Sequence, residues 1–410
     1  MKQDSKNNMK KLVCPSCSAH EIQVFHEIKN VPVNSVMNCD TREQALSFPR
    51  GDIILGLCEQ CGFIYNTAFD RNRVRYSSEC EESQGYSPTF NAFAEKLARD
   101  LVDKYGLYKK RIIEIGCGKG QFLKLICALG QNSGIGFDPA YIPGRGDLDH
   151  PAEKIEFVKD YYSEKYADYQ GDFICCRMTL EHISDTAIMV ETVRRSISEC
   201  PDTIVFFQVP DVTRIMQDCA FEDIYYEHCS YFSPGSLARL FRRSGFDVID
   251  LLREYENQYV CLEARPADRP QEIKHPLIEN VAALADLVTG FETTYPSVLD
   301  RWQTRLGQLK QQSQKVVIWG SGSKGVAFLN AIGDSAAIDY VVDIHPFRQQ
   351  TFMAGTGQQI VAPLFLKNYR PDIVIIMNAI YREEIRQELN HLGLEPALMT
   401  LDQRDGMAIK

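Results

Sequence analysis

The sequence predicts an α/β protein with two parallel, doubly wound sheets and a separate cysteine-rich module at its N-terminus. Two observations carry this prediction. Short apolar runs of strand length alternate with helical patterns between about residues 87 and 252, and again between 316 and 392. A glycine-rich loop follows the first strand of each stretch. Such alternation is typical of sheets whose parallel strands are joined by crossover helices.

The length and composition indicate a globular protein of several domains. The chain has 410 residues, 44% of them hydrophobic and 24% charged, and a single domain usually has ~100–200 residues. We expect four parts: the cysteine-rich module over residues 1–80, a core over 81–265, a helical connector over 266–314 and a second α/β unit over 315–410.

The charge and the hydropathy argue against two classes of partner. The formal net charge is −10, whereas proteins that bind nucleic acid or anionic lipid usually present a basic face. No run reaches the ~20 apolar residues of a membrane span, and the polar first residues carry no secretory signal. We therefore expect a cytoplasmic monomer or homodimer that acts on a small molecule, without nucleic acid or membrane.

The N-terminal module contains two Cys-x-x-Cys pairs, Cys14 with Cys17 and Cys58 with Cys61. Each pair supplies two thiolates from one turn, so the two pairs predict a tetrahedral zinc site. All four ligands are cysteines, and the predicted Zn²⁺ is therefore structural. Two unrelated pairs or a redox dithiol are the alternatives, although neither pair opens a helix in a βαβ unit.

The core begins with a helical pattern after Ser87, in which apolar residues recur at steps of three and four up to Val102. Short apolar strands and helices then alternate along the chain. We predict strands over 111–116, 133–137, 155–158, 172–176, 203–209 and 246–252, and helices over 121–129, 185–198 and 234–244.

Three groups of polar or glycine residues follow successive strands of this core. The loop after the first strand contains Gly116, Gly118 and Gly120, with Glu114 two residues before the first glycine. Glycines at that position let a ligand approach the backbone closely. Asp138 ends the second strand, where a carboxylate can accept the ribose hydroxyls of an adenosine, and Asp160 follows the third. A nicotinamide-binding domain is the alternative for this pattern.

The pattern resembles the class I S-adenosylmethionine-dependent methyltransferases, which implies a Rossmann-like core. In that family the segment matching Arg177–Ile183 lines the methionine end of the donor, and Asp160 would face the adenine amine. His182 lies in the same segment and either packs there or takes part in the chemistry. The resemblance implies that S-adenosylmethionine is bound by Glu114, Gly116, Gly118, Asp138, Asp160 and Arg177.

A second glycine loop opens the C-terminal unit. Gly320-Ser-Gly322-Ser-Lys-Gly325 follows the predicted strand 316–319 and precedes a helix over 324–332. Further strands are predicted over 338–342 and 373–377, with a helix over 381–392, and Asp343 ends the second strand. The loop has the G-x-G-x-x-G spacing of a dinucleotide site. A nucleotide or phosphate-bearing substrate, NAD and a purely structural role all remain open for it.

The order of the three parts resembles the sugar C-methyltransferases of bacterial deoxysugar pathways, over nearly the whole chain. The most specific element runs from Tyr225 to Ser233 and is similar to the Tyr-His-Glu-His-x-x-Tyr-Phe-Ser block of that family. Those enzymes methylate a carbon beside a ketone on a nucleotide-linked sugar. The resemblance implies His228 as the base that takes the α-proton, Tyr225 as the group that steadies the oxyanion, and Glu227 as the residue that orients the ring or the substrate.

Two departures from the family pattern bear on the acceptor. Tyr226 replaces the first histidine of the block, and Glu254–Tyr259 stands where the family has a His-Gly-Gly-Ser turn. A bulky polar turn indicates a different acceptor, so O- or N-methylation of a non-sugar natural-product or polysaccharide precursor stays open.

Two other classes of function remain as alternatives. An NAD-dependent oxidoreductase would use the loop from Gly320 to Gly325. A zinc-ribbon binding protein would dock a partner on residues 1–80 and keep its α/β units as inert scaffolds.

Overall fold

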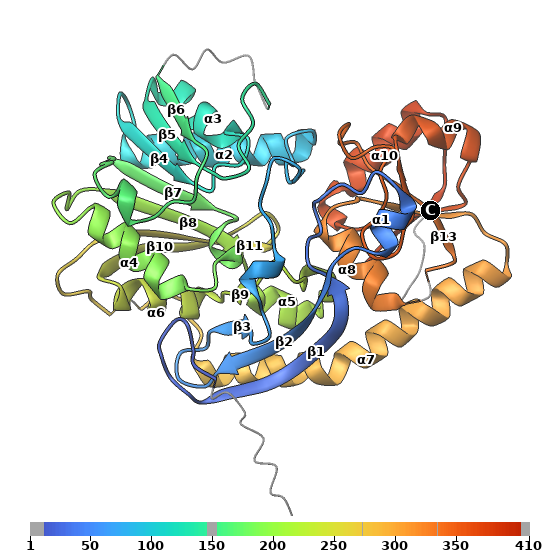
Figure 1. Cartoon of the computed structure of the whole chain (residues 1–410), viewed down its shortest axis with the longest axis horizontal. Helices are drawn as coiled ribbons and strands as arrows, with labels where there is room; N and C mark the ends of the chain where they lie inside the picture. Colours follow the sequence, from blue (N-terminus) through green and yellow to red (C-terminus); the bar gives the residue numbers. More distant parts are fainter. Residues whose placement is uncertain (1–11, 146–153, 273, 334, 403–410) are drawn as a thin grey trace, which may run out of the picture.

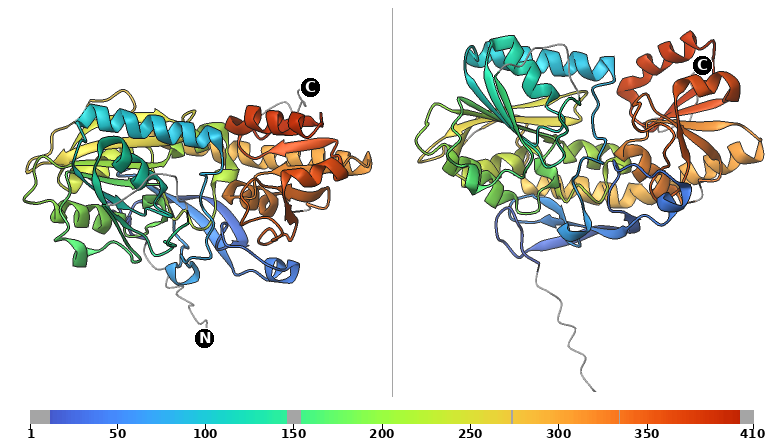
Figure 2. Two further views of the ribbon diagram at one scale, coloured as in Figure 1. Left: turned by 90° about the horizontal axis from the view of Figure 1, so that it is seen from above. Right: turned by 45° about the horizontal axis from the view of Figure 1, so that its top comes forward.

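Three sheets make up the structure, and most strands of each come from one of the predicted parts 1–80, 81–265 and 315–410 (Figure 1). The computed structural model describes residues 12–145, 154–272, 274–333 and 335–402. The core sheet and the C-terminal sheet lie side by side. The N-terminal sheet and the long helix α7 both lie along one side of this pair (Figures 1 and 2). None of the helices within these ranges is both long enough and apolar enough to span a membrane.

The N-terminal sheet is antiparallel and borrows a strand from the core. Its order is β1-β2-β3-β9, with β1 at Ile22–Pro32, β2 at Arg50–Cys58, β3 at Ile64–Asn66 and β9 at Ser230–Tyr231. Helix α1, Arg42–Leu46, and the 3-10 helix η1, Arg71–Arg73, lie in its connections. The pairing of β9 with β3 places the end of the aromatic block, residues 221–232, directly on the cysteine-rich module.

The core sheet has seven strands in the order β10-β11-β8-β7-β4-β5-β6. The five from β6 to β8 are parallel, whereas β11 and β10 run antiparallel at one edge. The strands are β4 (Arg111–Ile115), β5 (Ser133–Phe137), β6 (Ile155–Val158), β7 (Phe173–Arg177), β8 (Ile204–Pro210), β10 (Phe246–Glu254) and β11 (Tyr259–Pro266).

Helices cover both faces of the core sheet because its central strands are buried on both sides. Phe173 and Phe206 pack with α2 and α3 on one face, while Ile174 and Phe207 pack with α4 and α6 on the other. The helices and 3-10 turns are α2 (Pro88–Tyr105), α3 (Gln121–Gly130), η2 (Glu164–Tyr166), η3 (Leu180–His182), α4 (Thr186–Ser196), α5 (Val212–Asp218), η4 (Phe221–Asp223) and α6 (Pro234–Arg243).

The connector is one helix, α7, which spans Val281–Gln311 and contains Pro296. The C-terminal sheet that follows is parallel throughout, in the order β14-β13-β12-β15-β16. Its elements are β12 (Val316–Trp319), α8 (Ser323–Ile332), β13 (Ile338–Val342), β14 (Gln359–Val361), η5 (Pro363–Phe365), α9 (Leu366–Tyr369), β15 (Ile373–Ile376), η6 (Ala379–Tyr381), α10 (Arg382–His391) and β16 (Ala397–Thr400).

The predicted α/β class and the predicted strands of both units agree with the structure within one or two residues at most ends. The long hairpin of β1 and β2 was not predicted, because its connection, residues 33–49, shows no clear hydrophobic period. Strands β11, β14 and β16 were not predicted either.

The turn between β10 and β11 is strained. Tyr255, Glu256 and Asn257 have φ values of 55°, 53° and 61°, so three consecutive non-glycine residues are left-handed. The Tyr255 hydroxyl donates to the Tyr381 hydroxyl of the C-terminal unit at 2.7 Å. The contact between the two units therefore fixes a backbone conformation that residues with a Cβ disfavour.

We expect Glu256→Gly to stabilise the protein by about 0.5–1 kcal/mol, because glycine adopts this φ without the clash of a Cβ. Glu256→Ala removes the same charge but keeps the Cβ, so it should leave the free energy of unfolding nearly unchanged. Urea unfolding followed by fluorescence measures both. Equal effects of the two substitutions would show that the turn carries no such strain.

Candidate active site

The four cysteines of the two pairs converge in the N-terminal module. Cys14 and Cys17 lie in the turn before β1, Cys58 ends β2, and Cys61 lies in the turn before β3. The Sγ atoms of Cys14 and Cys61 are 3.7 Å apart, and those of Cys17 and Cys58 are 3.5 Å apart. A tetrahedral zinc ion with Zn–S bonds of ~2.3 Å requires about 3.8 Å between sulfurs. The donor set and its spacing therefore fit Zn²⁺.

The core holds this cysteine cluster in place. Gly62 has φ 72°, as a tight turn after a cysteine pair requires. From α6, the Arg239 guanidinium donates to the Cys61 carbonyl at 2.8 Å, and the Arg243 guanidinium donates to the Ser16 carbonyl at 3.2 Å. The cluster therefore fixes how the N-terminal sheet sits on the core.

A cavity of about 770 Å³ lies at the carboxyl ends of β4, β5 and β7. The glycine loop after β4 lines it, and Gly116, Gly118 and Gly120 have φ values of 70°, 53° and 80°. A Cβ on Gly116 would lie 2.0 Å from the Thr179 hydroxyl oxygen, and one on Gly120 would lie 2.4 Å from the Phe157 ring. The loop therefore requires glycine at Gly116 and Gly120, and Gly116 and Gly118 expose backbone to the cavity.

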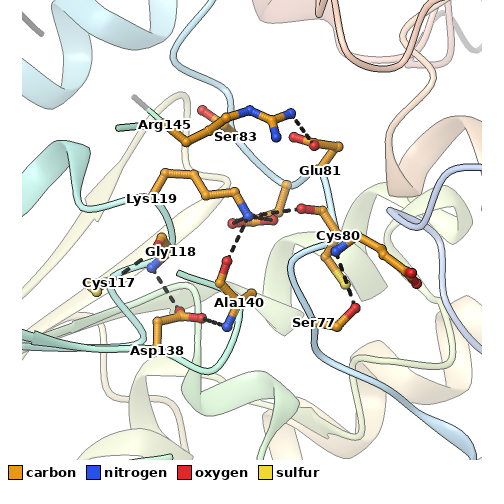
Figure 3. Close-up of polar contacts among 12 residues, drawn as sticks. Ser77, Cys80, Glu81, Ser83, Cys117, Gly118, Lys119, Asp138, Ala140 and Arg145 are labelled. Carbon is orange, nitrogen blue, oxygen red and sulfur yellow. Dashed lines mark hydrogen bonds and ion pairs between the residues drawn. The ribbon is translucent and has the colours of Figure 1, made fainter. Parts of the chain in front are cut away.

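Asp138 lies beside this loop, as the sequence predicts (Figure 3). Its carboxylate accepts hydrogen bonds from the backbone N–H of Gly118 at 2.8 Å and of Ala140 at 2.7 Å. Burial raises the pKa of Asp138 above its usual value, although both N–H groups act to lower it. The carboxylate is thus held in a fixed orientation at the cavity wall.

Glu114 and Arg177 also line the cavity. Glu114 is 3% exposed, its Oε2 has no partner among the described residues, and burial raises its pKa to about 8. The Arg177 guanidinium lies 3.8 Å from the centroid of the Phe122 ring and donates through Nε to Gln208 at 2.7 Å. An orphaned carboxyl oxygen beside a buried guanidinium suits a ligand with both charges, such as the amino acid end of S-adenosylmethionine.

Asp160 lines the same cavity, but its carboxylate already has partners. It contacts Lys165 Nζ and accepts from the Tyr166 hydroxyl at 2.7 Å. These bonds, that of Lys165 first, lower the pKa of Asp160 to about 2. Its contact with adenine stays a prediction.

A segment that was not predicted from the sequence closes one wall of the cavity. We call this segment, residues 76–87 between the N-terminal sheet and α2, the strap. The Lys119 ammonium is buried and donates to the Cys80 carbonyl at 3.0 Å and to the Ala140 carbonyl at 3.1 Å, and it pairs with Glu82 at 3.3 Å (Figure 3). Lys119 therefore links the strap to the glycine loop. Its position between two glycines in the sequence did not predict this contact.

The aromatic block places Tyr225 and His228 in the wall of the same cavity. The Tyr225 hydroxyl lies 2.8 Å from His228 Nε2, and His228 Nδ1 has no partner within the described part of the chain. Burial, followed by the charges of His182 and Lys324, lowers the pKa of His228 well below its ordinary value. The ring is therefore neutral at pH 7 and can accept a proton.

Glu227 does not contact the His228 ring. Its carboxylate accepts from the Ser35 backbone N–H at 2.9 Å, from the Ser35 hydroxyl, and from the Asn34 amide at 3.2 Å. It is 1% exposed, and burial raises its pKa. Glu227 therefore binds the N-terminal module and not the His228 ring that the resemblance suggests it orients.

The C-terminal glycine loop lines a second cavity of about 270 Å³, which adjoins the first. Tyr225 and Ser323 belong to the walls of both, as do Glu82 and Gln84 of the strap. Asp343 is occupied, because its carboxylate accepts from the Ser321 backbone N–H at 2.7 Å and from the His345 N–H at 2.8 Å. The two glycine loops thus face one continuous space that the strap borders.

Replacing Cys58 and Cys61 by serine should abolish zinc retention and unfold the N-terminal sheet, since a structural zinc contributes its binding energy to folding. Metal analysis of purified protein should fall from one equivalent of zinc per chain to none, and the melting temperature should drop. Cys200→Ser, at a half-buried cysteine outside the cluster, is the control. Full zinc content in the double variant would contradict the assignment.

Two protein families match successive parts of the chain. Residues 90–251 match a family described as a methyltransferase domain, and residues 272–395 match one described as a C-methyltransferase C-terminal domain. The C-methyltransferase NovU of Streptomyces niveus is 26% identical over 304 residues, which cover 71% of each chain. A ubiquinone biosynthesis O-methyltransferase of Aromatoleum aromaticum is 26% identical over 173 residues, 38% of this chain and 72% of that one.

Among solved structures, the 1,6-didemethyltoxoflavin-N1-methyltransferase of Burkholderia thailandensis aligns with a TM-score of 0.34 and 14% identity, over 44% of this chain and 82% of that one. The family matches favour the methyltransferase prediction over the oxidoreductase and the scaffold alternatives. Both α/β units fall within families of methyl-transferring enzymes, and the chain is an S-adenosylmethionine-dependent methyltransferase with a C-methyltransferase C-terminal domain.

Proposed function

We propose that this enzyme transfers the methyl group of S-adenosylmethionine to a carbon atom of a small molecule that lies between the two glycine loops. One observation carries the proposal: the donor cavity and the C-terminal cavity meet at Tyr225 and Ser323, beside His228. An acceptor in the second cavity would therefore present its reacting atom to the donor next to a neutral imidazole.

The donor is assigned to the larger cavity. Asp138 would accept the ribose hydroxyls, the backbone of Gly116 and Gly118 would lie against the ligand, and Glu114 and Arg177 would face its charged end. S-Adenosylmethionine supplies an activated methyl group when it is bound. Asp160 would contact the adenine amine through Oδ1, which also accepts from the Tyr161 backbone N–H at 2.8 Å.

The proton chemistry is assigned to the aromatic block. Removing a proton beside a ketone needs a base and a donor for the enolate oxygen. His228 is buried and neutral, and the Tyr225 hydroxyl 2.8 Å from its Nε2 is placed to donate to a developing oxyanion. Glu227 would act indirectly, by fixing the block through Ser35. The rest of the rate enhancement would come from holding the acceptor carbon in line with the methyl group.

A nucleotide-linked keto sugar is the first acceptor class to test. Lys324 and Arg348 line the second cavity, and a ligand with phosphate groups would share Lys324 with Asp223. Gln258 and Tyr259, from the turn that departs from the family pattern, line it too. They narrow the sugar end of the site, which supports a different sugar or a related metabolite as the acceptor.

Methylation of oxygen or nitrogen is the second candidate. The relatives named as O-methyltransferases cover at most 38% of the chain, whereas the C-methyltransferase relative covers 71%. The larger coverage, together with the match of the C-terminal domain, favours carbon.

We expect Asp138→Ala to weaken S-adenosylhomocysteine binding roughly 10- to 100-fold, the effect of losing hydrogen bonds to a charged group. Asp168→Ala, at an exposed position, should leave the affinity unchanged. Calorimetric titration of the zinc-loaded protein measures both, and a parallel titration with NADH should give no heat. An unchanged affinity in Asp138→Ala would move the donor site elsewhere.

We expect the zinc-loaded enzyme, given methyl-¹³C S-adenosylmethionine and a panel of nucleotide-linked keto sugars, to form a carbon-linked methyl group that ¹³C NMR distinguishes from oxygen- or nitrogen-linked ones. His228→Asn should lower turnover roughly 100-fold or more, while S-adenosylhomocysteine affinity stays normal. His391→Asn, an exposed control, should behave as the parent. Full turnover of His228→Asn, or an equal loss of donor affinity, would remove its assignment as the base.

A further inference from the structure

Glu181 is a buried acid that the proposed chemistry has not yet used. It lies in η3, directly after β7, and lines the donor cavity. The residue is 1% exposed, and neither of its carboxyl oxygens has a hydrogen-bond partner among the described residues. Buried carboxyl groups are nearly always paired, so an unpaired one in a cavity wall points to a functional partner.

The nearest groups of suitable chemistry are two imidazoles. One ligand atom each of Glu181, His182 and His228 lies within 4.8 Å of the other two. His182 is already committed, because its Nδ1 lies 2.8 Å from the Tyr76 hydroxyl and 3.1 Å from the Glu227 carbonyl. His228 turns Nε2 to Tyr225 and leaves Nδ1 without a partner in the described ranges. Nδ1 of His228 is therefore the buried ring nitrogen of this cluster that has no hydrogen-bond partner in the described part of the chain.

We propose that Glu181 is the positioning residue that pairs with His228 and compensates its charge when the imidazole takes the proton of the acceptor. The inference rests on the proposed role of His228 as base. Glu227, the acid that the family pattern suggests, is engaged with Asn34 and Ser35 and does not reach the ring. Glu181 is therefore the acid that we assign as the partner of the His228 ring.

The proposed step moves one proton and one methyl group. His228 takes the proton from the acceptor carbon at Nε2, as the Tyr225 hydroxyl that faces Nε2 turns to donate to the enolate oxygen. The electron pair of that C–H bond becomes the enolate. A new carbon–carbon bond then forms to the methyl group as the methyl–sulfur bond breaks, which releases S-adenosylhomocysteine. The imidazolium is left in a buried site, where an unpaired charge costs several kcal/mol, and the Glu181 carboxylate pairs with it.

The charges that surround the pair determine its titration. His228 faces His182 from η3, Tyr225 and Tyr231 from the block, and Lys324 from α8, and both His182 and Lys324 lower its pKa. Asp223, which forms an ion pair with Lys324, offsets that charge in part. Burial raises the pKa of Glu181 to about 8. A bound sulfonium favours the carboxylate form, so Glu181 releases its proton to solvent when S-adenosylmethionine binds and is ionised before the proton of the acceptor moves.

The sign of the effect of Glu181→Gln follows from this pairing. A neighbouring carboxylate raises the pKa of an imidazole, and the neutral amide does not. The variant should therefore protonate His228 at lower pH than the parent. In turnover, the acidic limb of the pH profile should move to lower pH while the plateau rate falls, because the base is weaker and its product cation is uncompensated.

The first test needs no acceptor. Full-length, zinc-loaded protein with ¹³Cε1-labelled histidine and saturating S-adenosylmethionine, without acceptor, is titrated by NMR, and the His228 signal is the one that His228→Asn removes. We expect Glu181→Gln to lower the midpoint of His228 by at least ~1 pH unit, the effect of an opposite charge within ~4–6 Å. Glu82→Gln removes a carboxylate from the same cavity, paired with Lys119, and should move the midpoint little.

Identical titrations of His228 in the parent and in Glu181→Gln, including a lack of protonation in both, would overturn the proposal. So would a second metal equivalent per chain that Glu181→Gln removes, because the imidazole would then be a ligand. If Glu181→Gln fails to bind S-adenosylmethionine, Glu181→Asp is used; it keeps the charge at a longer distance and should lower the midpoint by less.

Turnover supplies the second readout once an acceptor is found. Glu181→Gln should lower kcat at least ~10-fold with the shifted acidic limb, and Glu181→Asp should recover part of the rate. A lower kcat with an unshifted limb would indicate a merely structural role and overturn the pairing. Because the NMR titration requires no acceptor, a coupled His228 in an enzyme that leaves keto sugars unmethylated would refute the acceptor class alone.

Discussion

The buried carboxylate of Glu227 is the contact on which the arrangement of the three units depends. It lies in the core's aromatic block and accepts from Asn34 and Ser35 of the N-terminal module. The Ser35 hydroxyl is also 2.7 Å from that of Ser323, in the C-terminal glycine loop. Taking a carboxylate out of water costs several kcal/mol unless hydrogen bonds replace the lost hydration. The core and the N-terminal module must therefore both be in place for this group to be satisfied, and Ser35 joins them to the C-terminal glycine loop.

The same dependence explains why the zinc cluster lies far from the chemistry and still matters to it. The cluster fixes the N-terminal sheet on α6, the sheet pairs with the block through β9, and the block carries Tyr225 and His228. The strap adds a second connection, because Lys119 binds it to the glycine loop of the donor cavity. The cysteine cluster is thus connected to Tyr225 and His228 through the hydrogen-bonded strands of the N-terminal sheet.

The elements that could be predicted from the sequence are those whose pattern lies within a few neighbouring residues. Strands such as 133–137 are short apolar runs, and the loop from Gly116 to Gly120 must be glycine because its backbone adopts positive φ. Cys14, Cys17, Cys58 and Cys61 could be paired because a Cys-x-x-Cys turn carries its own geometry. The two sheets and the cysteine cluster therefore followed from patterns that span a few residues each.

What the sequence could not supply are contacts between residues far apart in the chain. Ser35 and Glu227 are 192 positions apart, and nothing in the segment around Ser35 marks it as the partner of a catalytic block. Glu181 could not be predicted as a site residue for a related reason. An acid after a strand is common, and only the structure places it near His228.

The strain in the turn from Tyr255 to Asn257 shows how the same scaffold can be fitted to a different acceptor. Where the family has glycines, this chain holds three left-handed residues that bring Gln258 and Tyr259 to the wall of the second cavity. Gln258 and Asn378 exchange hydrogen bonds at 3.1 and 2.9 Å, so the turn is held against the C-terminal unit. Because the donor side is unaffected by this change, selection of the acceptor can vary independently of methyl transfer. His228 and Glu181 lie in the core, while Gln258 and Tyr259 of the turn and Lys324 of the C-terminal unit line the second cavity.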